Sequence, residues 1–298
     1  MQVIRHSEDA LRTALISQDR KLAKLFEENT PGERRLLSEA FREDSALFKH
    51  VTIHSDSDWI PSHSEHTQDF EEFYKDPCRN MLTSKRSIIY VQPIGSFGDS
   101  EVTTEDYIGW LKDYCESFYY GLTVKILAPV SVSETECVFR VNQHTENLQI
   151  HAGGLLSYLK KRKPKDAYCI VGITMMDLYP RESWNFVFGQ ASLTEGVGIF
   201  SFARYDSNFY SKNYEGKVVH GKQVVRGDYS VFDGYYTPPV TGMLLLRSCK
   251  ALLRWIDEGV AEANSETGYG AQGCTQKPVE EFKEHHNWIQ KCLSLLQT

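Results

Sequence analysis

The sequence predicts an α/β protein, and three patterns of residues lead to that fold class. Buried β-strands are indicated by two apolar runs rich in β-branched residues, 88–94 and 169–174. Between the first of these and another strand at 122–130, residues 103–118 place apolar side chains at helical spacing. A strand, a helix and a strand in this order predict a βαβ unit whose strands pair in parallel.

The N-terminal part begins with short helices and loops. Thr30, Pro31 and Glu33 form a capping box with proline at the first helical position, which predicts a helix from Pro31 to about Arg42. Residues 50–86 are rich in Ser, His, Asp and Pro and show no sustained periodicity. We therefore expect this segment to be a surface loop or linker.

Further elements follow the first βαβ unit. A short strand is possible at 137–141, and leucines at helical spacing predict a helix that ends before Pro164. Apolar and charged residues alternate at three and four positions over 241–259, which predicts an amphipathic helix ended by a glycine. A last helix is expected to begin at Pro278.

The stretch 168–205 predicts one wall of a cleft. After the buried strand 169–174, residues 177–183 form a polar corner, and a second strand is expected over 196–202. The glycines of this second strand predict that it is weak and lies at an exposed edge. Because an unpaired edge can add an extended peptide as a further strand, its residues are the candidate substrate-binding set: Gly196, Val197, Gly198, Ile199, Phe200, Ser201 and Phe202.

Composition limits the classes of partner. The net charge of -7 and the pI near 5.8 argue against nucleic acid, because phosphate binding requires concentrated Lys and Arg. The one basic run, 160–165, is expected to be a solvated helix end. Neither a signal peptide nor an apolar run of about 18 residues is present, so we expect no membrane partner. Seven scattered cysteines without a CxxC pair fit a reducing compartment, and we predict an intracellular protein, in the cytoplasm or also in the nucleus.

A search for catalytic residues finds no recognisable set. The pattern HExxH, which places two imidazoles on one helical face beside a general base, does not occur. The P-loop and GxSxG are also absent, and the single GxGxxG, residues 268–273, lies in a polar linker instead of between a strand and a helix. Three histidine pairs have suggestive spacing, but surface or packing roles explain them better than metal binding: His50 with His54, His63 with His66, and His285 with His286.

Several longer segments carry a specific pattern over nearly the whole chain. They include MQVIRHSE, RSIIYVQPIGS, YGLTVKIL, LQIHAG, VGITMMDLYPRESWNFVFGQASLTEGVGIFSFARY, LLLRSCK and ALLRWIDEG. This pattern resembles the archaemetzincin (archaelysin) family of zinc metallopeptidases. The resemblance implies a metzincin-like domain with a mixed twisted sheet, flanking helices and an edge strand that binds peptide. It also implies one zinc on a long helix, where a zinc-polarised water and a glutamate base cleave the substrate.

The chain departs from the family after Lys250. In the family, LLLRSCK continues into HExxHxxGxxH, which supplies three histidine ligands and the base, and then into a cysteine-rich stretch that holds a structural zinc. Here Lys250 runs directly into Ala251 and the family's later segment. Intact flanks favour an in-frame deletion, most simply a splice form, over gradual drift. No family zinc ligand or base can be placed on this chain, so we expect no catalytic residue and no retained zinc.

The resulting expectation is an inactive member of the family that still binds a peptide or protein segment along 196–202. The alternative is an active, aminopeptidase-like zinc enzyme with unrecognised ligands such as His285 and His286. A third possibility is an unstable form that is quickly degraded.

The expected organisation has four parts. A helical and loop extension is expected over residues 1–85, and a metzincin-like α/β domain over 86–259. This domain lacks the zinc helix and the cysteine-rich segment, so we expect it to be incomplete on its C-terminal side. A linker over 260–277 and a C-terminal helix over 278–298 complete the chain.

Overall fold

The computed structural model contains two compact units, residues 1–79 with 283–298 and residues 80–282. The residues that it describes are 2–56, 59–62, 69–77, 81–97, 104–119, 121–192, 194–218, 224–241, 244–245, 247–249, 252, 287–288, 290–292 and 294–295. The first unit combines segments from both ends of the chain, and the second contains the larger sheets. The predicted boundaries at 85, 259 and 277 stay predictions.

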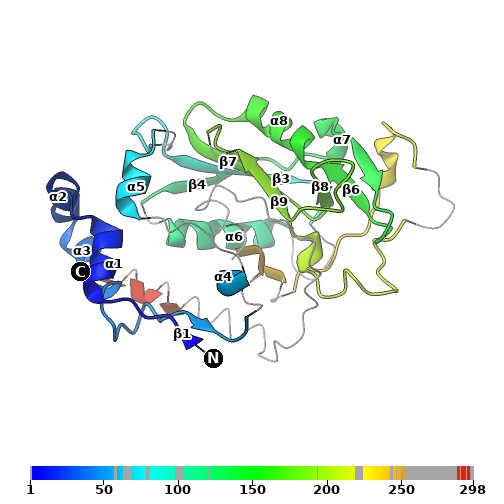
Figure 1. The fold of residues 1–298 in the computed structure, drawn as a ribbon. Helices are drawn as coiled ribbons and strands as arrows, with labels where there is room; N and C mark the ends of the chain where they lie inside the picture. The colour runs from blue at the N-terminus through cyan, green and yellow to red at the C-terminus, as the bar shows by residue number, and fades with distance from the viewer. Residues whose placement is uncertain are drawn as a thin grey trace. The chain divides into compact units, whose positions relative to one another are not determined.

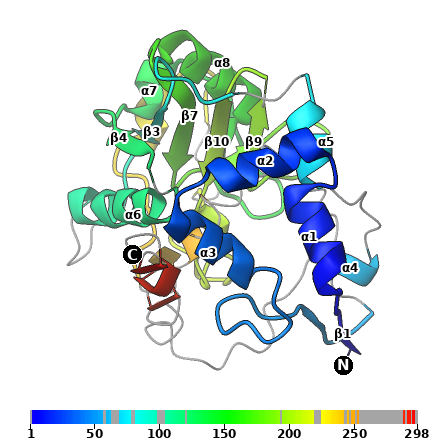
Figure 2. The same cartoon turned by 90° about the vertical axis from the view of Figure 1, so that its left-hand side faces the viewer.

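The first unit is built from short helices and one small sheet (Figure 2). Strand β1 (Gln2–Val3) pairs antiparallel with β2 (Thr52–Ile53). The helices are α1 (Glu8–Ile16), α2 (Arg20–Glu28), α3 (Pro31–Glu39), α4 (Trp59–Ser62) and α5 (Phe70–Lys75). The capping box predicted for α3 is confirmed, because Thr30 and Glu33 exchange backbone and side-chain hydrogen bonds. Two helices and a strand occupy the region that was expected to be loop.

The C-terminal residues belong to this first unit. Those that are described between 287 and 295 are helical. The Trp288 indole donates a hydrogen bond to the Leu47 carbonyl at 2.9 Å and packs edge-on against Phe48. Pro278, where this helix was predicted to begin, lies outside the described residues.

The second unit contains a five-stranded mixed sheet with the order β4-β3-β7-β10-β9. Strands β4 (Thr123–Ile126), β3 (Ile88–Ile94), β7 (Ala167–Thr174) and β10 (Val197–Ser201) are parallel. Strand β9 (Gly189–Ser192) is antiparallel to β10. Helix α6 (Thr104–Phe118) connects β3 to β4. The predicted α/β class and the predicted βαβ unit are therefore confirmed.

Helices cover both faces of this sheet. Figure 1 shows α6 on one face and α8 (Ala152–Arg162) on the other. Leu155 and Leu159 of α8 are fully buried and pack with Ile170 and Ile199 of the sheet. These apolar contacts explain why β7 has no polar face, as expected for a parallel strand covered on both sides.

A smaller sheet of three strands adjoins the first in the same unit. Its order is β5 (Phe139–Val141), β6 (Leu148–His151) and β8 (Asp177–Tyr179). The short helix α7 (Val132–Thr135) precedes β5, and two 3-10 turns follow the large sheet, η1 (Ala203–Tyr205) and η2 (Tyr229–Phe232). Strand β8 directly follows β7, so the chain passes from one sheet to the other within a few residues.

The sheet order contradicts the prediction that residues 196–202 form an edge strand. Strand β10 lies between β7 and β9 and all five of its residues are buried. Its glycines have a packing role instead. A Cβ on Gly198 would lie 2.8 Å from the Phe200 ring, and one on Gly189 would lie 1.8 Å from the same ring. The glycines therefore make room for Phe200, and the outer strands of the sheet are β4 and β9.

A proline inside β3 is accommodated by its neighbour. Pro93 has no N–H to donate, yet β3 lies between two other strands. The buried Gln92 side-chain amide donates to the Ala128 carbonyl at 2.8 Å and to the Pro93 carbonyl at 3.0 Å. The glutamine thus satisfies an acceptor beside the position where the proline lacks its donor.

A buried ion pair joins the two sheets. Arg204 donates two hydrogen bonds of 2.7 Å to Asp177, whose carboxylate also accepts from Gln149 at 2.8 Å. The two charged side chains are 2% and 1% exposed. Burial acts to lower the pKa of Arg204, but the Asp177 carboxylate outweighs it and the pKa lies above its ordinary value.

None of the helices in the described part of the chain combines the length and the apolar character that a bilayer crossing needs.

We predict that Gly189→Ala destabilises the protein by about 2 kcal/mol, because the new methyl group would overlap the buried Phe200 ring. Gly109 in α6 is the matched control, since nothing lies within 4 Å of the Cβ that an alanine would add there. Gly109→Ala is expected to stabilise the helix by about 1 kcal/mol. Urea unfolding of the two variants measures both effects, and equal stabilities would contradict the packing of Phe200 against Gly189.

We predict that Arg204→Met destabilises the protein by about 3 to 5 kcal/mol, because it leaves the Asp177 carboxylate buried without its charge partner. The double variant Asp177→Asn with Arg204→Met is expected to be clearly more stable than the sum of the two single changes. A double-mutant cycle from denaturant unfolding measures this coupling. Additive effects would show that the pair does not act as a unit.

Candidate functional site

Strand β9 is one of the two outer strands of the five-stranded sheet, with β4 at the opposite side, and its free edge forms the first part of the candidate site. Phe188, just before the strand, accepts a hydrogen bond from the Ser201 N–H of β10 at 2.8 Å. In an antiparallel pair, the N–H and C=O groups of successive residues point alternately toward the partner strand and away from it. The N–H and C=O groups of Gly189 and Ala191 therefore point away from β10. Among the described strands, none pairs with this outer side of β9. An extended peptide could therefore form backbone hydrogen bonds there.

The edge lacks the features that usually block strand addition. Native sheets protect free edges with lysine, proline, bulges or inward-pointing charges. Strand β9 has the sequence GQAS, which is small and uncharged, and its register with β10 is regular. The edge is therefore suited to pairing with another chain.

The turn that carries β9 into β10 is fixed by the basic end of α8. Lys160 forms an ion pair with Glu195, and the Lys163 ammonium donates to the Glu195 carbonyl at 2.7 Å. Desolvation lowers the pKa of Lys163 from its ordinary value. Gly196 in the same turn has a φ of 59°, which favours glycine. Two lysines of the run that was expected to be solvated thus hold the hairpin in place.

An aromatic cluster lies where the free edge begins. We call Phe186, Phe188, Tyr205 and Tyr210 the aromatic shelf. Phe188 stacks on Tyr205 with centroids 5.3 Å apart and an interplanar angle of 13°, and it meets Phe186 edge-on at 5.4 Å.

Arg204 contacts two residues of the aromatic shelf, Phe186 and Tyr210. Its guanidinium lies 3.5 Å from the Phe186 ring centroid and donates to the Tyr210 hydroxyl at 2.8 Å. Tyr210 is nevertheless 64% exposed. A buried cation thus fixes an exposed ring at the surface.

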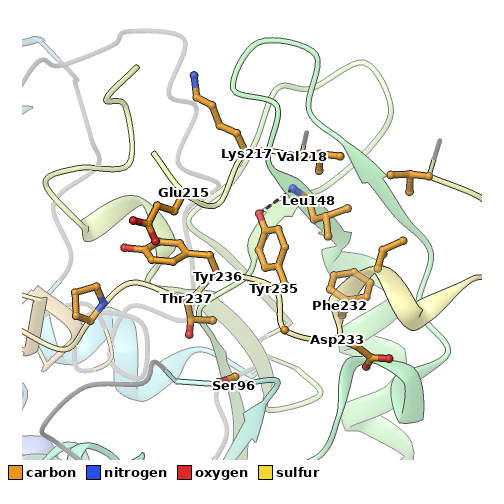
Figure 3. Close-up of a pocket in the computed structure, with 14 residues that line it drawn as sticks. Ser96, Leu148, Glu215, Lys217, Val218, Phe232, Asp233, Tyr235, Tyr236 and Thr237 are labelled. Atoms are coloured by element: carbon orange, nitrogen blue, oxygen red, sulfur yellow. Dashed lines mark hydrogen bonds between the residues drawn. The ribbon is translucent and has the colours of Figure 1, made fainter. Parts of the chain in front are cut away.

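A pocket of about 930 Å³ lies elsewhere in the same unit (Figure 3). Its walls come from Ser96 after β3, Leu148 of β6, residues 215–218 and residues 231–239. The Tyr235 hydroxyl accepts from the Leu148 N–H at 3.1 Å and donates to the Gly216 carbonyl at 2.6 Å. Burial raises the pKa of Tyr235 well above its ordinary value, so this hydroxyl stays protonated and has a structural role.

The helix predicted at 241–259 is described only in its first part. Leu244, Leu245, Arg247, Ser248, Cys249 and Leu252 are helical, and residues 253–259 lie outside the described part. The Tyr107 hydroxyl of α6 donates to Ser248 at 2.6 Å, and Arg247 donates to the Tyr205 carbonyl at 2.6 Å. Leu252, two residues beyond the predicted junction, is fully buried. Buried side chains therefore lie on both sides of the predicted junction.

The described side chains do not fit a catalytic zinc ion. No group of three His, Cys, Asp or Glu residues among them is arranged to hold a metal. Both ring nitrogens of His151 are occupied, one by the Gly154 N–H and the other by the Pro180 carbonyl. Burial raises the pKa of Cys169 and of Cys249 to about 12, so these thiols are protonated at neutral pH, unlike a metal-bound thiolate.

The histidine pairs are only partly described. His50 contacts the Glu43 carbonyl at 3.0 Å, and it shares no metal-binding group with His54. His63, His66, His285 and His286 lie outside the described residues. Sequence reasoning missed both β9 and the shelf, because GQAS has no apolar alternation and Tyr210 lies in a segment without periodicity.

Comparisons with known proteins identify relatives over the full length. The chain is 48% identical to archaemetzincin-2 of Macaca fascicularis and 47% identical to archaemetzincin-2 of Homo sapiens, with all of each chain covered. It is 39% identical to archaemetzincin-1 of Mus musculus, over 67% of this chain and 40% of that protein. No family model matches. A crystal structure of an archaemetzincin from Methanopyrus kandleri aligns with 73% of this chain and 99% of that one, at 15% identity and a TM-score of 0.37.

The alignments with archaemetzincin-2 also differ in length from the chain. Each runs over 359 positions, whereas the chain has 298 residues, so roughly sixty aligned positions have no residue here. The alignments nevertheless cover the whole of both proteins. The chain belongs to the archaemetzincin family of zinc metallopeptidases.

Proposed function

We propose that this chain is an archaemetzincin polypeptide without a catalytic zinc centre and without peptidase activity. The main support is that HExxH occurs nowhere in the 298 residues, whereas the alignments with archaemetzincin-2 span 359 positions. The intact flanks LLLRSCK and ALLRWIDEG favour a single missing segment between Lys250 and Ala251. An in-frame deletion, most simply by alternative splicing, accounts for both facts.

We further propose that the chain keeps the capacity to bind an extended peptide or protein segment. The free edge of β9 supports this, since Gly189 and Ala191 offer backbone groups that no described strand uses. The hairpin is also held by Lys160 and Lys163, so the edge would bind without first becoming ordered. The proposed peptide-binding strand is therefore β9, and not residues 196–202, for which peptide binding was predicted from the sequence.

We place the protein inside the cell, in the cytoplasm or also in the nucleus. The described cysteines are free, and four of the five are in or near the core. Buried reduced thiols fit a compartment in which glutathione keeps cysteine reduced.

Elemental analysis of the purified chain tests the loss of the metal centre. We expect far less than one zinc per chain and no cleavage of peptide reporters, because the ligand motif is missing. A stoichiometry near one, together with chelator-sensitive cleavage, would favour the active alternative. In that event His285→Ala with His286→Ala should remove the zinc, since these are the ligands that the alternative names.

Restoring the missing segment provides the complementary test. Insertion of the archaemetzincin-2 residues between Lys250 and Ala251 is expected to give a chain that binds zinc and cleaves peptides. The matched control carries Gln in place of the glutamate of the inserted HExxH, and it should bind zinc without cleavage. A restored chain that binds zinc but stays inactive would count against a simple deletion as the cause.

A further inference from the structure

The aromatic shelf adjoins the proposed peptide site. Phe188 is the residue immediately before β9, so the rings begin where the free edge begins. Val187, two residues before β9, donates its N–H to the Leu178 carbonyl of β8 at 2.9 Å. A peptide paired with β9 would therefore meet β8 and the shelf together at one end.

The shelf is both exposed and rigidly held. Tyr210 is 64% exposed, although Arg204 fixes its hydroxyl at 2.8 Å. The Phe188 and Tyr205 rings are half-buried and stacked, and the Tyr205 carbonyl accepts a hydrogen bond from Arg247. Rings fixed in this way bind a partner with little loss of side-chain entropy. Large exposed aromatic side chains of this kind are enriched among residues that dominate binding energy.

The electrostatics of the shelf favour an uncharged group. Arg204 is the cation that contacts its rings, and Asp177 already neutralises it. Arg247 also lies beside the shelf, where its guanidinium donates to the Tyr205 carbonyl. The aromatic faces favour another ring in a stacked or edge-on arrangement.

We propose that the aromatic shelf is a specificity subsite that takes an aromatic side chain of an extended peptide paired with β9. This inference rests on the proposed peptide binding and adds the chemical class of the peptide. Tyr210 and Phe188 are the specificity-determining residues, and Arg204 with Asp177 positions them. The peptide is an uncharged or weakly charged strand with one Phe, Tyr or Trp at the end that lies against Phe188.

Fluorescence anisotropy with blocked heptapeptides tests the subsite in the full chain. The probes are an acetylated and amidated Ser/Thr/Val heptapeptide with a dye on a terminal linker, and its relatives with one Phe at each position in turn. Phe at one end position is expected to tighten binding three- to tenfold, the range that aromatic pairs give. Leu at that position should give a smaller gain, and Lys none.

Variants of the shelf separate this preference from backbone pairing. Tyr210→Ala and Phe188→Leu should remove most of the preference for Phe, measured as the ratio of the affinities for the Phe-containing and Phe-free peptides. Tyr210→Phe, which keeps the ring and loses the hydrogen bond to Arg204, should retain most of it. Phe118→Ala is the matched control, because this partly exposed ring lies on α6 outside the shelf. Thermal unfolding checks that each variant is folded.

The outcomes distinguish the inference from the function on which it rests. Binding of all peptides without a preference for Phe would overturn the subsite and leave strand addition in place. A preference that survives in both Tyr210→Ala and Phe188→Leu would also overturn it. If none of the peptides binds, both the proposed peptide binding and the subsite are wrong.

Discussion

The buried pair of Asp177 and Arg204 is the interaction on which the second unit most depends. It connects β8, in the smaller sheet, with the turn after β10, in the larger one. Gln149 of β6 donates to the same carboxylate, so three elements meet at one charged group. Removing two charges from water costs several kcal/mol each, and only a complete set of partners offsets this. The pair therefore favours one arrangement of the two sheets over alternatives in which a partner is missing.

Much of the fold follows from local patterns in the sequence. Strands β3 and β7 are apolar runs and α6 has clear helical spacing, so all three elements were predicted. The parallel pairing predicted for β3 and β4 is also confirmed. The capping box at Thr30 similarly fixed the start of α3. These elements are predictable because their signal lies within a few adjacent residues, and nothing distant in the chain is needed to interpret it.

The position of the edge could not be predicted in the same way. Glycine in a strand can indicate exposure or close packing, and composition alone does not distinguish them. Gly198 lies on the same strand as Phe200, whereas Gly189 comes from β9, and only strand pairing brings it against the Phe200 ring. Strand β9 itself has four small or polar residues with no alternation, so its place at the edge depends on where the chain turns back at Gly196.

The proposed loss of catalysis does not require the loss of the fold. A structural zinc contributes folding free energy of about 10 kcal/mol, so the proposed chain without one needs a compensating core. Leu244, Cys249 and Leu252 provide part of one, because each is almost fully buried in the second unit. Complete burial of an apolar side chain stabilises by about 1.5 to 3 kcal/mol, and the Tyr107 hydrogen bond to Ser248 orients the helix that carries these residues. Cys249 precedes the proposed junction and Leu252 follows it, and both side chains are buried in the second unit. Burial on both sides of the proposed junction supports a chain that lacks the metal motif and still keeps the sheet, the outer strand β9 and the aromatic shelf in one folded unit.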